Sequence, residues 1–209
     1  GSLTVATMIL YTSKLAEQGY EIIGSNYREK DEFGRAEIND VLSLTETLKE
    51  IEKADSNCIG MLGWSRGGMM TYLALQKSDK IKTAIVGNGP TDLFGLISDR
   101  PEMESKVIAE CVPNYCNKKE SELKKRSVIY WTEELDKKSS LLILCGTKDQ
   151  RVNPEQADKV AEKLTEIEYD YELRKVETDH YFSDHKTALN ALLIEWFNKR
   201  LKNKYCALD

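Results

Sequence analysis

The chain has 209 residues, of which 41% are hydrophobic and 31% are charged, and its formal net charge at pH 7 is -5. This length fits one domain with a sizeable core, and the composition is that of an ordinary globular protein. The acidic balance gives no reason to expect a nucleic-acid partner, because proteins that bind nucleic acid carry clustered basic surface.

The sequence also gives no sign of a membrane segment or of a metal site. No apolar stretch approaches the roughly 18 residues of a membrane span, and the start does not resemble a signal peptide. We therefore expect no membrane span and a cytoplasmic location, although the chain begins Gly1-Ser2 without Met, so that an upstream signal would not be visible. The two histidines and scattered cysteines do not form a zinc set, and we expect neither a metal nor a cofactor.

Short apolar runs alternate with helical periods along the chain. Helices are predicted over about 3–17, 38–53, 66–76 and 183–201, and a further helix is predicted to begin at 153–156. Strands are predicted over about 20–24, 57–62, 81–86, 141–145 and 169–173. The run at 141–145 is apolar throughout, as a strand buried on both faces must be, whereas 169–173 alternates like a strand nearer an edge. This alternation predicts an α/β fold with a mostly parallel sheet and helices on both faces.

The region from about 90 to 134 is long, polar and poorly periodic. Long insertions over a sheet are usually functional or mobile. We expect one domain, 1–209, with a lid-like insertion of short helices that covers the site. Tyr115, Tyr130 and Trp131 are candidate wall residues of an acyl pocket, with packing into the core as the alternative role for each.

The sharpest motif is Gly63-Trp64-Ser65-Arg66-Gly67, which follows a predicted strand and precedes a predicted helix. Gly-x-Ser-x-Gly in that context is the nucleophile elbow, a strained turn that exposes the Ser hydroxyl. Gly63 and Gly67 are expected because side chains would collide where strand and helix come close. The backbone N–H of Arg66 is the candidate oxyanion donor. The alternative is a glycine-rich turn with Ser65 as an ordinary helix N-cap.

A serine nucleophile needs a base within hydrogen-bond reach, and only His180 and His185 can supply one. His180 lies in a loop between the last predicted strand and the last helix, where ligands bind in open α/β folds. His185 falls at the start of the last helix, where a surface position is the simpler interpretation. The sequence therefore favours His180.

Asp149 is the candidate acid, because it lies in a loop directly after the buried strand. The chain order Ser65, Asp149, His180 is the order expected for this elbow. The alternatives are that Asp149 only caps its loop, or that Asp92, after an earlier strand, is the acid. Asp179 is too close in sequence to face His180.

These motifs resemble the catalytic α/β-hydrolase domain of the prolyl oligopeptidase family of serine peptidases, with its dipeptidyl-peptidase and acylaminoacyl-peptidase relatives. The likeness rests on Gly-Trp-Ser-x-Gly-Gly at 63–68, the Gly-x-x-Asp-x-x-Val pattern at 146–152, the histidine loop at 179–182 and the stretches 15–20 and 26–28. The resemblance implies a serine hydrolase that cleaves small peptides through an acyl-enzyme. A carboxylesterase acting on small acyl esters and a non-catalytic binding homologue are the alternatives.

The chain departs from the family pattern at several points. Cys145 stands where family members usually have His before the Gly-x-x-Asp motif, and Arg66 replaces a neutral residue after the nucleophile. We expect no counterpart, within these 209 residues, of the propeller of larger relatives. The family's N-terminal strands and their His-Gly-Gly-like loop, a source of the second oxyanion donor, would precede residue 1. Losing one such donor typically costs about 3 kcal/mol of transition-state stabilisation, and an unpaired sheet edge would favour a homo-oligomer.

Overall fold

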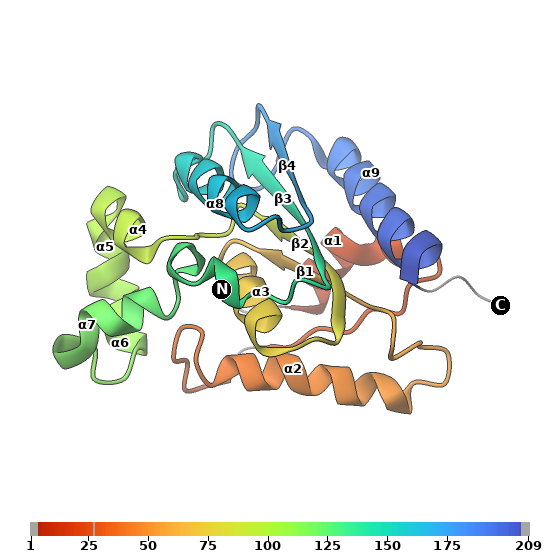
Figure 1. Ribbon diagram of the computed structural model, residues 1–209, viewed down its shortest axis with the longest axis horizontal. Coiled ribbons are helices and arrows are strands. Elements are labelled where there is room, and N and C mark those ends of the chain that lie inside the picture. The colour runs from red at the N-terminus through yellow and green to blue at the C-terminus, as the bar shows by residue number, and fades with distance from the viewer. Residues whose placement is uncertain (1–3, 27, 206–209) are drawn as a thin grey trace.

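The structure is a computed structural model that describes residues 4–26 and 28–205. Four strands form one parallel sheet in the order β1-β2-β3-β4 (Figure 1). The strands are β1 (Ile59–Trp64), β2 (Ile81–Gly87), β3 (Ser140–Gly146) and β4 (Tyr171–Val176). Because all four strands run in the same direction, their carboxyl ends, and the loops that follow them, lie along one edge of the sheet.

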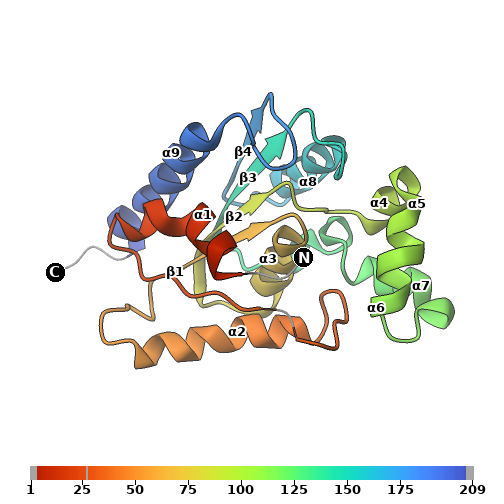
Figure 2. The ribbon, with the colours of Figure 1, turned by 180° about the vertical axis from the view of Figure 1, so that it is seen from behind.

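Helices cover both faces of this sheet, which confirms the predicted fold class. The spatial order of the strands follows the chain order, so the crossover helices pass over the same face. Figure 1 shows α3 (Arg66–Lys77) and α8 (Glu155–Glu166) in front of the strands. The opposite face, seen in Figure 2, carries α1 (Val5–Ala16) and α9 (Lys186–Phe197), and α2 (Glu37–Thr47) packs beside α3. Shorter elements are the 3-10 turn Leu48–Glu50 and the π-helix Asn198–Tyr205.

Two apolar clusters fill the space between helices and sheet. Ala84, Val86 and Ile143 belong to the cluster on the α3 and α8 side. Ile85 and Leu142, which point to the other face because side chains alternate along a strand, belong to the cluster with α9. The sheet is therefore buried on both sides, which explains why its inner strands read as continuous apolar runs.

Most predicted elements form within a few residues of their expected bounds, but the predicted strand at 20–24 is wrong. Residues 20–26 follow α1 without strand structure. The segment is held by side chains instead: the Tyr20 hydroxyl donates a hydrogen bond to Asn198 Oδ1 at 2.9 Å, and the Tyr20 ring packs against Phe197. An extended segment counts as a strand only when a neighbouring strand pairs with its backbone, and none of the four described strands does so.

The irregular region between β2 and β3 folds into short helices, as expected. They are α4 (Leu93–Asp99), α5 (Pro101–Met103), a π-helix (Glu104–Ile108), α6 (Ala109–Cys111), α7 (Tyr115–Lys124) and two 3-10 turns (Val128–Tyr130 and Thr132–Glu134). They project to one side of the sheet (Figure 1). Tyr115 and Trp131 are buried and Tyr130 is exposed. Tyr115 and Trp131 thus pack within the protein, which was the alternative role for them.

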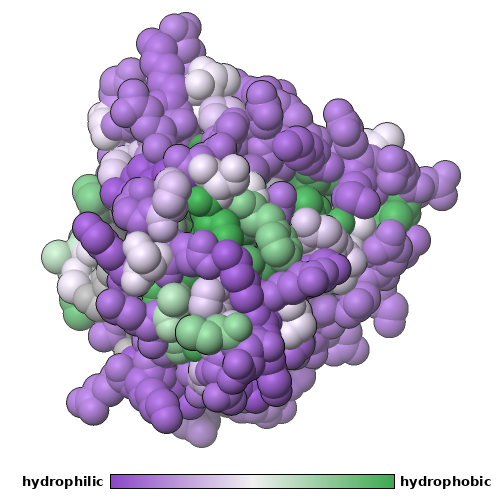
Figure 3. All heavy atoms as spheres, turned by 90° about the vertical axis from the view of Figure 1, so that its left-hand side faces the viewer, coloured by the Kyte–Doolittle hydropathy of each residue, from purple (hydrophilic) through white to green (hydrophobic). Residues whose placement is uncertain are grey.

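Figure 3 shows the side of the molecule on which this insertion projects. Apolar atoms gather near the centre of this face, within a rim that is mostly hydrophilic.

Among the described residues, no helix is both long enough and apolar enough to cross a membrane.

Candidate active site

Ser65 sits in a strained turn between β1 and α3. Its backbone has φ 54° and ψ -121°, a combination that non-glycine residues rarely adopt and that costs of order 1–3 kcal/mol. The Ser65 N–H donates to the Gly87 carbonyl at 2.8 Å, and the Ser65 carbonyl accepts from the Gly68 N–H at 2.8 Å. The neighbouring strand β2 and the first turn of α3 therefore hold the strained residue in place.

The elbow glycines differ in how much space there is for a side chain at each position. A Cβ on Gly63 would lie 2.1 Å from the Gly67 carbonyl oxygen and 2.2 Å from Thr71 Oγ1, so no side chain fits there. A Cβ on Gly67 would meet nothing within 4 Å, so the collision expected at Gly67 is wrong. The crowded helix position is Gly68, where a Cβ would lie 2.8 Å from the Gly89 Cα. The close approach falls one residue later because Gly67 faces open space while Gly68 faces the β2 end.

His180 and Asp149 meet across the loops that follow β4 and β3. His180 Nδ1 lies 2.6 Å from Asp149 Oδ2, and both side chains are almost fully buried. The other carboxylate oxygen, Oδ1, accepts from the backbone N–H groups of Arg151 at 2.7 Å and Val152 at 3.1 Å. The carboxylate is thus fixed by its own loop, with one oxygen turned toward the imidazole.

The second ring nitrogen of His180 is left for another partner. Nε2 is buried and has no hydrogen-bond partner among the described residues. The Trp64 indole Nε1 donates to the His180 carbonyl at 2.8 Å, which ties the base loop to the residue directly before Ser65. The imidazole therefore lies beside the elbow with one nitrogen on Asp149 and the other unpaired.

The other candidates from the sequence are engaged elsewhere. Asp92 caps α4 and accepts from the Phe94 N–H at 2.9 Å. His185 Nδ1 lies 2.9 Å from Asp184 Oδ1 near the surface. Asp179 accepts from the Tyr181 and Ser183 N–H groups within its own loop. The acid in hydrogen-bond contact with His180 is Asp149.

Aromatic rings pack around the elbow and the loop that carries His180. Trp64 makes an edge-to-face contact with Phe182 at 5.3 Å and stacks on Tyr11 at 5.8 Å. The Tyr181 ring stands edge-to-face against the His180 imidazole at 4.9 Å, with the Arg151 guanidinium 5.7 Å above it. The Tyr181 ring thus covers one side of the imidazole. The Asp149–His180 pair is almost fully buried, and hydrogen bonds are electrostatically stronger in a low dielectric.

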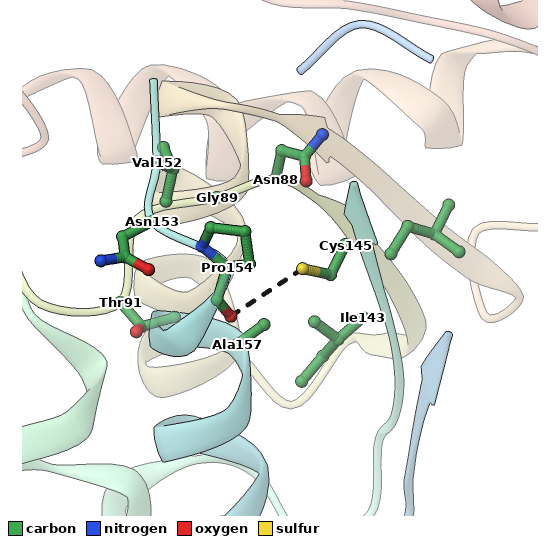
Figure 4. Close-up of a pocket in the computed structure, with 10 residues that line it drawn as sticks. Asn88, Gly89, Thr91, Ile143, Cys145, Val152, Asn153, Pro154 and Ala157 are labelled. Carbon is green, nitrogen blue, oxygen red and sulfur yellow. Dashed lines mark hydrogen bonds between the residues drawn. The ribbon is translucent and has the colours of Figure 1, made fainter. Parts of the chain in front are cut away.

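A small cavity lies beside β3 on the α8 side of the site (Figure 4). It is lined by residues of the β2 and β3 ends and of the start of α8, and neither Ser65 nor His180 lines it. The Cys145 thiol points into this space and lies 3.9 Å from the Pro154 carbonyl. Burial raises the pKa of Cys145 to about 11, so this thiol, which replaces the family's usual His, stays protonated at neutral pH.

Two side chains near the site had no role in the sequence interpretation. Asn88, at the end of β2, donates from Nδ2 to the His180 carbonyl at 2.9 Å. Asp31 forms a two-point ion pair with Arg66, the residue after Ser65. A polar residue at the carboxyl end of a parallel strand is a sequence signal for Asn88, whereas nothing in the sequence pairs Asp31 with Arg66. In the part of the chain that the structure describes, no group of three or more His, Cys, Asp or Glu side chains could hold a metal ion.

Comparisons with known proteins find a similar sequence and similar folds. The chain is 24% identical over 149 residues to a Schizosaccharomyces pombe protein provisionally named a dipeptidyl aminopeptidase, which covers 70% of this chain and 16% of that protein. The fold is similar to that of a Pyrococcus horikoshii acylaminoacyl peptidase, with a TM-score of 0.72 at 23% identity over 86% of this chain and 30% of that chain. It is also similar to the Pyrococcus furiosus esterase Pf2001, with a TM-score of 0.69 at 19% identity over 93% of this chain and 76% of that chain.

These likenesses to solved structures show the fold. The chain spans less than a third of the length of each of the two peptidase relatives. The family match is more specific. The profile of the prolyl oligopeptidase family matches residues 16–204, which include the elbow, the Asp149 loop and the His180 loop. This chain belongs to the prolyl oligopeptidase family.

Proposed function

We propose that this chain is the catalytic part of a serine peptidase that hydrolyses small peptides through an acyl-enzyme on Ser65. The observation that carries the proposal is the pairing of His180 Nδ1 with Asp149 at 2.6 Å while the buried Nε2 has no partner among the described residues. Activation of a serine hydroxyl requires a base with an acid bonded to one ring nitrogen and with no partner on the other. Ser65 lies one residue from the indole that holds the base loop.

In the proposed reaction, Ser65 Oγ attacks the substrate carbonyl and His180 Nε2 takes the hydroxyl proton. Asp149 fixes the tautomer with the proton on Nδ1 and stabilises the imidazolium that forms. The tetrahedral oxyanion rests against the backbone N–H of Arg66, the first residue of α3, where the helix dipole also favours negative charge. His180 then protonates the leaving amine, and water resolves the acyl-enzyme with the same base.

We also propose that the insertion at 90–134 covers the acyl side of Ser65 within a single domain. Its support is a chain of contacts: the Arg66 guanidinium lies 4.6 Å over the Phe33 ring, and Arg126 of the insertion donates to the Phe33 carbonyl at 2.7 Å. The insertion therefore reaches the loop that packs against the residue after Ser65. Substrates that fit under this cover are small.

An esterase is the second candidate, because the esterase Pf2001 has this fold and the chain spans 76% of it. The triad chemistry is the same for both carbonyl types, so substrate tests must separate them. Turnover of aminoacyl p-nitroanilides, which are amides, should be compared with turnover of p-nitrophenyl acetate, an ester. Hydrolysis of the ester with no hydrolysis of any amide would favour the esterase.

A fluorophosphonate probe tests the proposal itself. The wild-type protein should be labelled, with the added mass on the peptide that contains Ser65. Ser65→Ala should abolish labelling and His180→Ala should nearly do so, whereas His185→Ala is the matched control and should label normally. A wild-type protein that is not labelled would contradict the catalytic proposal and favour a binding homologue, and a fully reactive His180→Ala variant would contradict the choice of base.

A further inference from the structure

Asn88 connects the three strand ends around the candidate site. It follows β2, and its side-chain amide donates from Nδ2 to the His180 carbonyl at 2.9 Å. The same amide accepts through Oδ1 from the Gly146 N–H at 2.8 Å. Figure 4 shows the amide oxygen turned toward the end of β3 and the nitrogen turned away from it. One side chain therefore contacts the strand end that leads into the Asp149 loop and the loop that carries His180.

The backbone of Asn88 is held in an unusual conformation. Its φ is 45°, in the left-handed region, which asparagine adopts more readily than most other residues with a side chain. The Asn88 N–H donates to the Leu144 carbonyl at 2.9 Å, so the residue is anchored to β3 as well. This backbone conformation points the amide between β3 and the His180 loop.

The bonds made by Asn88 are buried and correctly matched. The residue is only 6% exposed, and one end of the amide donates while the other accepts. A hydrophobic side chain of the same size would therefore remove one hydrogen bond from the His180 carbonyl and one from the Gly146 N–H. The His180 carbonyl also accepts from Trp64 Nε1 at 2.8 Å. Asn88 and Trp64 thus hold the backbone of the base from two sides.

We propose that Asn88 is a positioning residue that acts through His180. It fixes the backbone of the base relative to the end of β3, and thereby keeps the imidazole aligned between Asp149 and Ser65. This inference rests on the proposed function, because it assigns Asn88 a part in the same reaction. Asn88 does not touch the reacting atoms, so its removal should alter turnover without altering substrate binding.

Asn88→Gly is the sharpest variant, because glycine adopts a positive φ without strain and only the two amide hydrogen bonds are lost. With p-nitrophenyl acetate as substrate, kcat should fall about 10- to 100-fold while KM stays within about twofold, as expected when a catalytic group is displaced by a fraction of an ångström to an ångström. Residues that act as a unit are non-additive. In a His180→Ala background, Asn88→Gly should therefore cause no further loss.

The matched control is Glu168→Gly, at another position with a positive φ (55°). Glu168 lies between α8 and β4, at the amino ends of the strands and so at the opposite end of the sheet from Asn88. It should keep wild-type turnover. Trp64→Phe removes the second donor to the His180 carbonyl but keeps an aromatic ring. If Asn88→Gly does not fold, this variant tests whether support of the His180 carbonyl affects turnover. It should lower kcat and show the same non-additivity with His180→Ala.

Wild-type turnover in Asn88→Gly would overturn the inference. It would also be overturned if Asn88→Gly lowered kcat by the same factor in the His180→Ala background as in the wild type, because Asn88 would then act on the protein structure in general and not through His180. A readout that needs no turnover separates this result from a failure of the proposed function. The proton on His180 Nδ1, shared with Asp149, should give a far-downfield NMR resonance. Broadening or loss of this resonance in Asn88→Gly supports the inference, and an unchanged resonance overturns it even if Ser65 proves unreactive.

Discussion

The guanidinium of Arg66 and the carboxylate of Asp31 form a two-point ion pair directly beside the nucleophile. Arg66 is the residue after Ser65, and its guanidinium also stacks over the Phe33 ring. Neither member of the pair is more than about a quarter exposed. The position where the family usually has a neutral side chain therefore carries a charge that is neutralised within the protein and anchors the loop at 31–37 to the elbow.

We expect Asp31→Asn to destabilise the protein by about 1–3 kcal/mol, because it leaves a largely buried guanidinium without its counter-charge. Denaturant unfolding at neutral pH measures this. Asp40→Asn is the matched control, since Asp40 makes a similar two-point pair with Arg28 that is more exposed, and exposed pairs contribute little. Equal losses in the two variants would contradict the special role of the Arg66 pair.

The same pair predicts a pH dependence. Burial alone would raise the pKa of Asp31, but the hydrogen bonds from Arg66 and the Phe33 backbone and the guanidinium charge outweigh it and hold the pKa below its ordinary value. The stabilisation is therefore complete above the ordinary carboxylate pKa of about 3.9 and is lost as the pH falls through the lower folded-state pKa. Asp31→Asn should show a flatter decline of stability on the acid side of pH 4 than the wild type.

Asp149→Asn should lower kcat by several orders of magnitude, up to about 10⁴-fold, because an amide favours the wrong imidazole tautomer. The effect is measured as the rate of hydrolysis of an activated ester. Asp92→Asn is the comparison, since Asp92 only caps α4, and we expect nearly full turnover from it. A larger loss from Asp92→Asn than from Asp149→Asn would move the acid to the β2 end.

The elbow glycines should respond differently to alanine. Gly63→Ala should destabilise the protein by about 3 kcal/mol or more, because its Cβ would overlap the Gly67 carbonyl. Gly67→Ala should be tolerated and could add about 0.5–1 kcal/mol of stability, since alanine is the better helix former. Thermal unfolding of the two variants decides this, and a collapse of Gly67→Ala would show that the space at Gly67 is not available.

Cys145 should resist modification in the folded protein. Its pKa is raised to about 11 by burial, so little reactive thiolate forms at pH 8, whereas Cys116 is exposed. With iodoacetamide at pH 8, mass spectrometry should find Cys116 alkylated well before Cys145. Because the folded pKa lies above the unfolded one, the stability that Cys145 contributes is full below about pH 9 and declines as the pH rises toward 11. Early alkylation of Cys145 would contradict this burial.

Arg126 should be important for the contact between the insertion and the loop at 31–37. Its guanidinium is buried, pairs with Glu122 at 2.7 Å and donates to the Glu32 and Phe33 carbonyls. Arg126→Met should cost about 3–5 kcal/mol in unfolding free energy, because it leaves a buried carboxylate without this partner. Lys125→Met is the matched control: Lys125 pairs with the same Glu122 carboxylate but is exposed, and its loss should change little.

The sequence by itself determined the fold class, the elbow and the two loops that hold Asp149 and His180. These were readable because each depends on local order: an apolar strand, a glycine-rich turn, a helix start, and a polar residue just after a strand. The parallel direction of the strands then required the loops to share one edge of the sheet. The prediction failed at 20–24, because whether an extended segment becomes a strand depends on a pairing partner and not on its own residues.

Only the tertiary structure decided which side chains meet. Asp149 and Asp92 both follow strands, and the sequence could not tell which of them meets His180; in the structure one Asp149 oxygen faces His180, while Asp92 caps α4. The hydrogen bond from Asn88 to the His180 carbonyl and the Asp31–Arg66 ion pair join residues that are 92 and 35 positions apart. The place of Asn88 at a strand end can be read from the sequence, but the partner of its amide, like that of Asp31, depends on where packing of the whole core places the strands and loops.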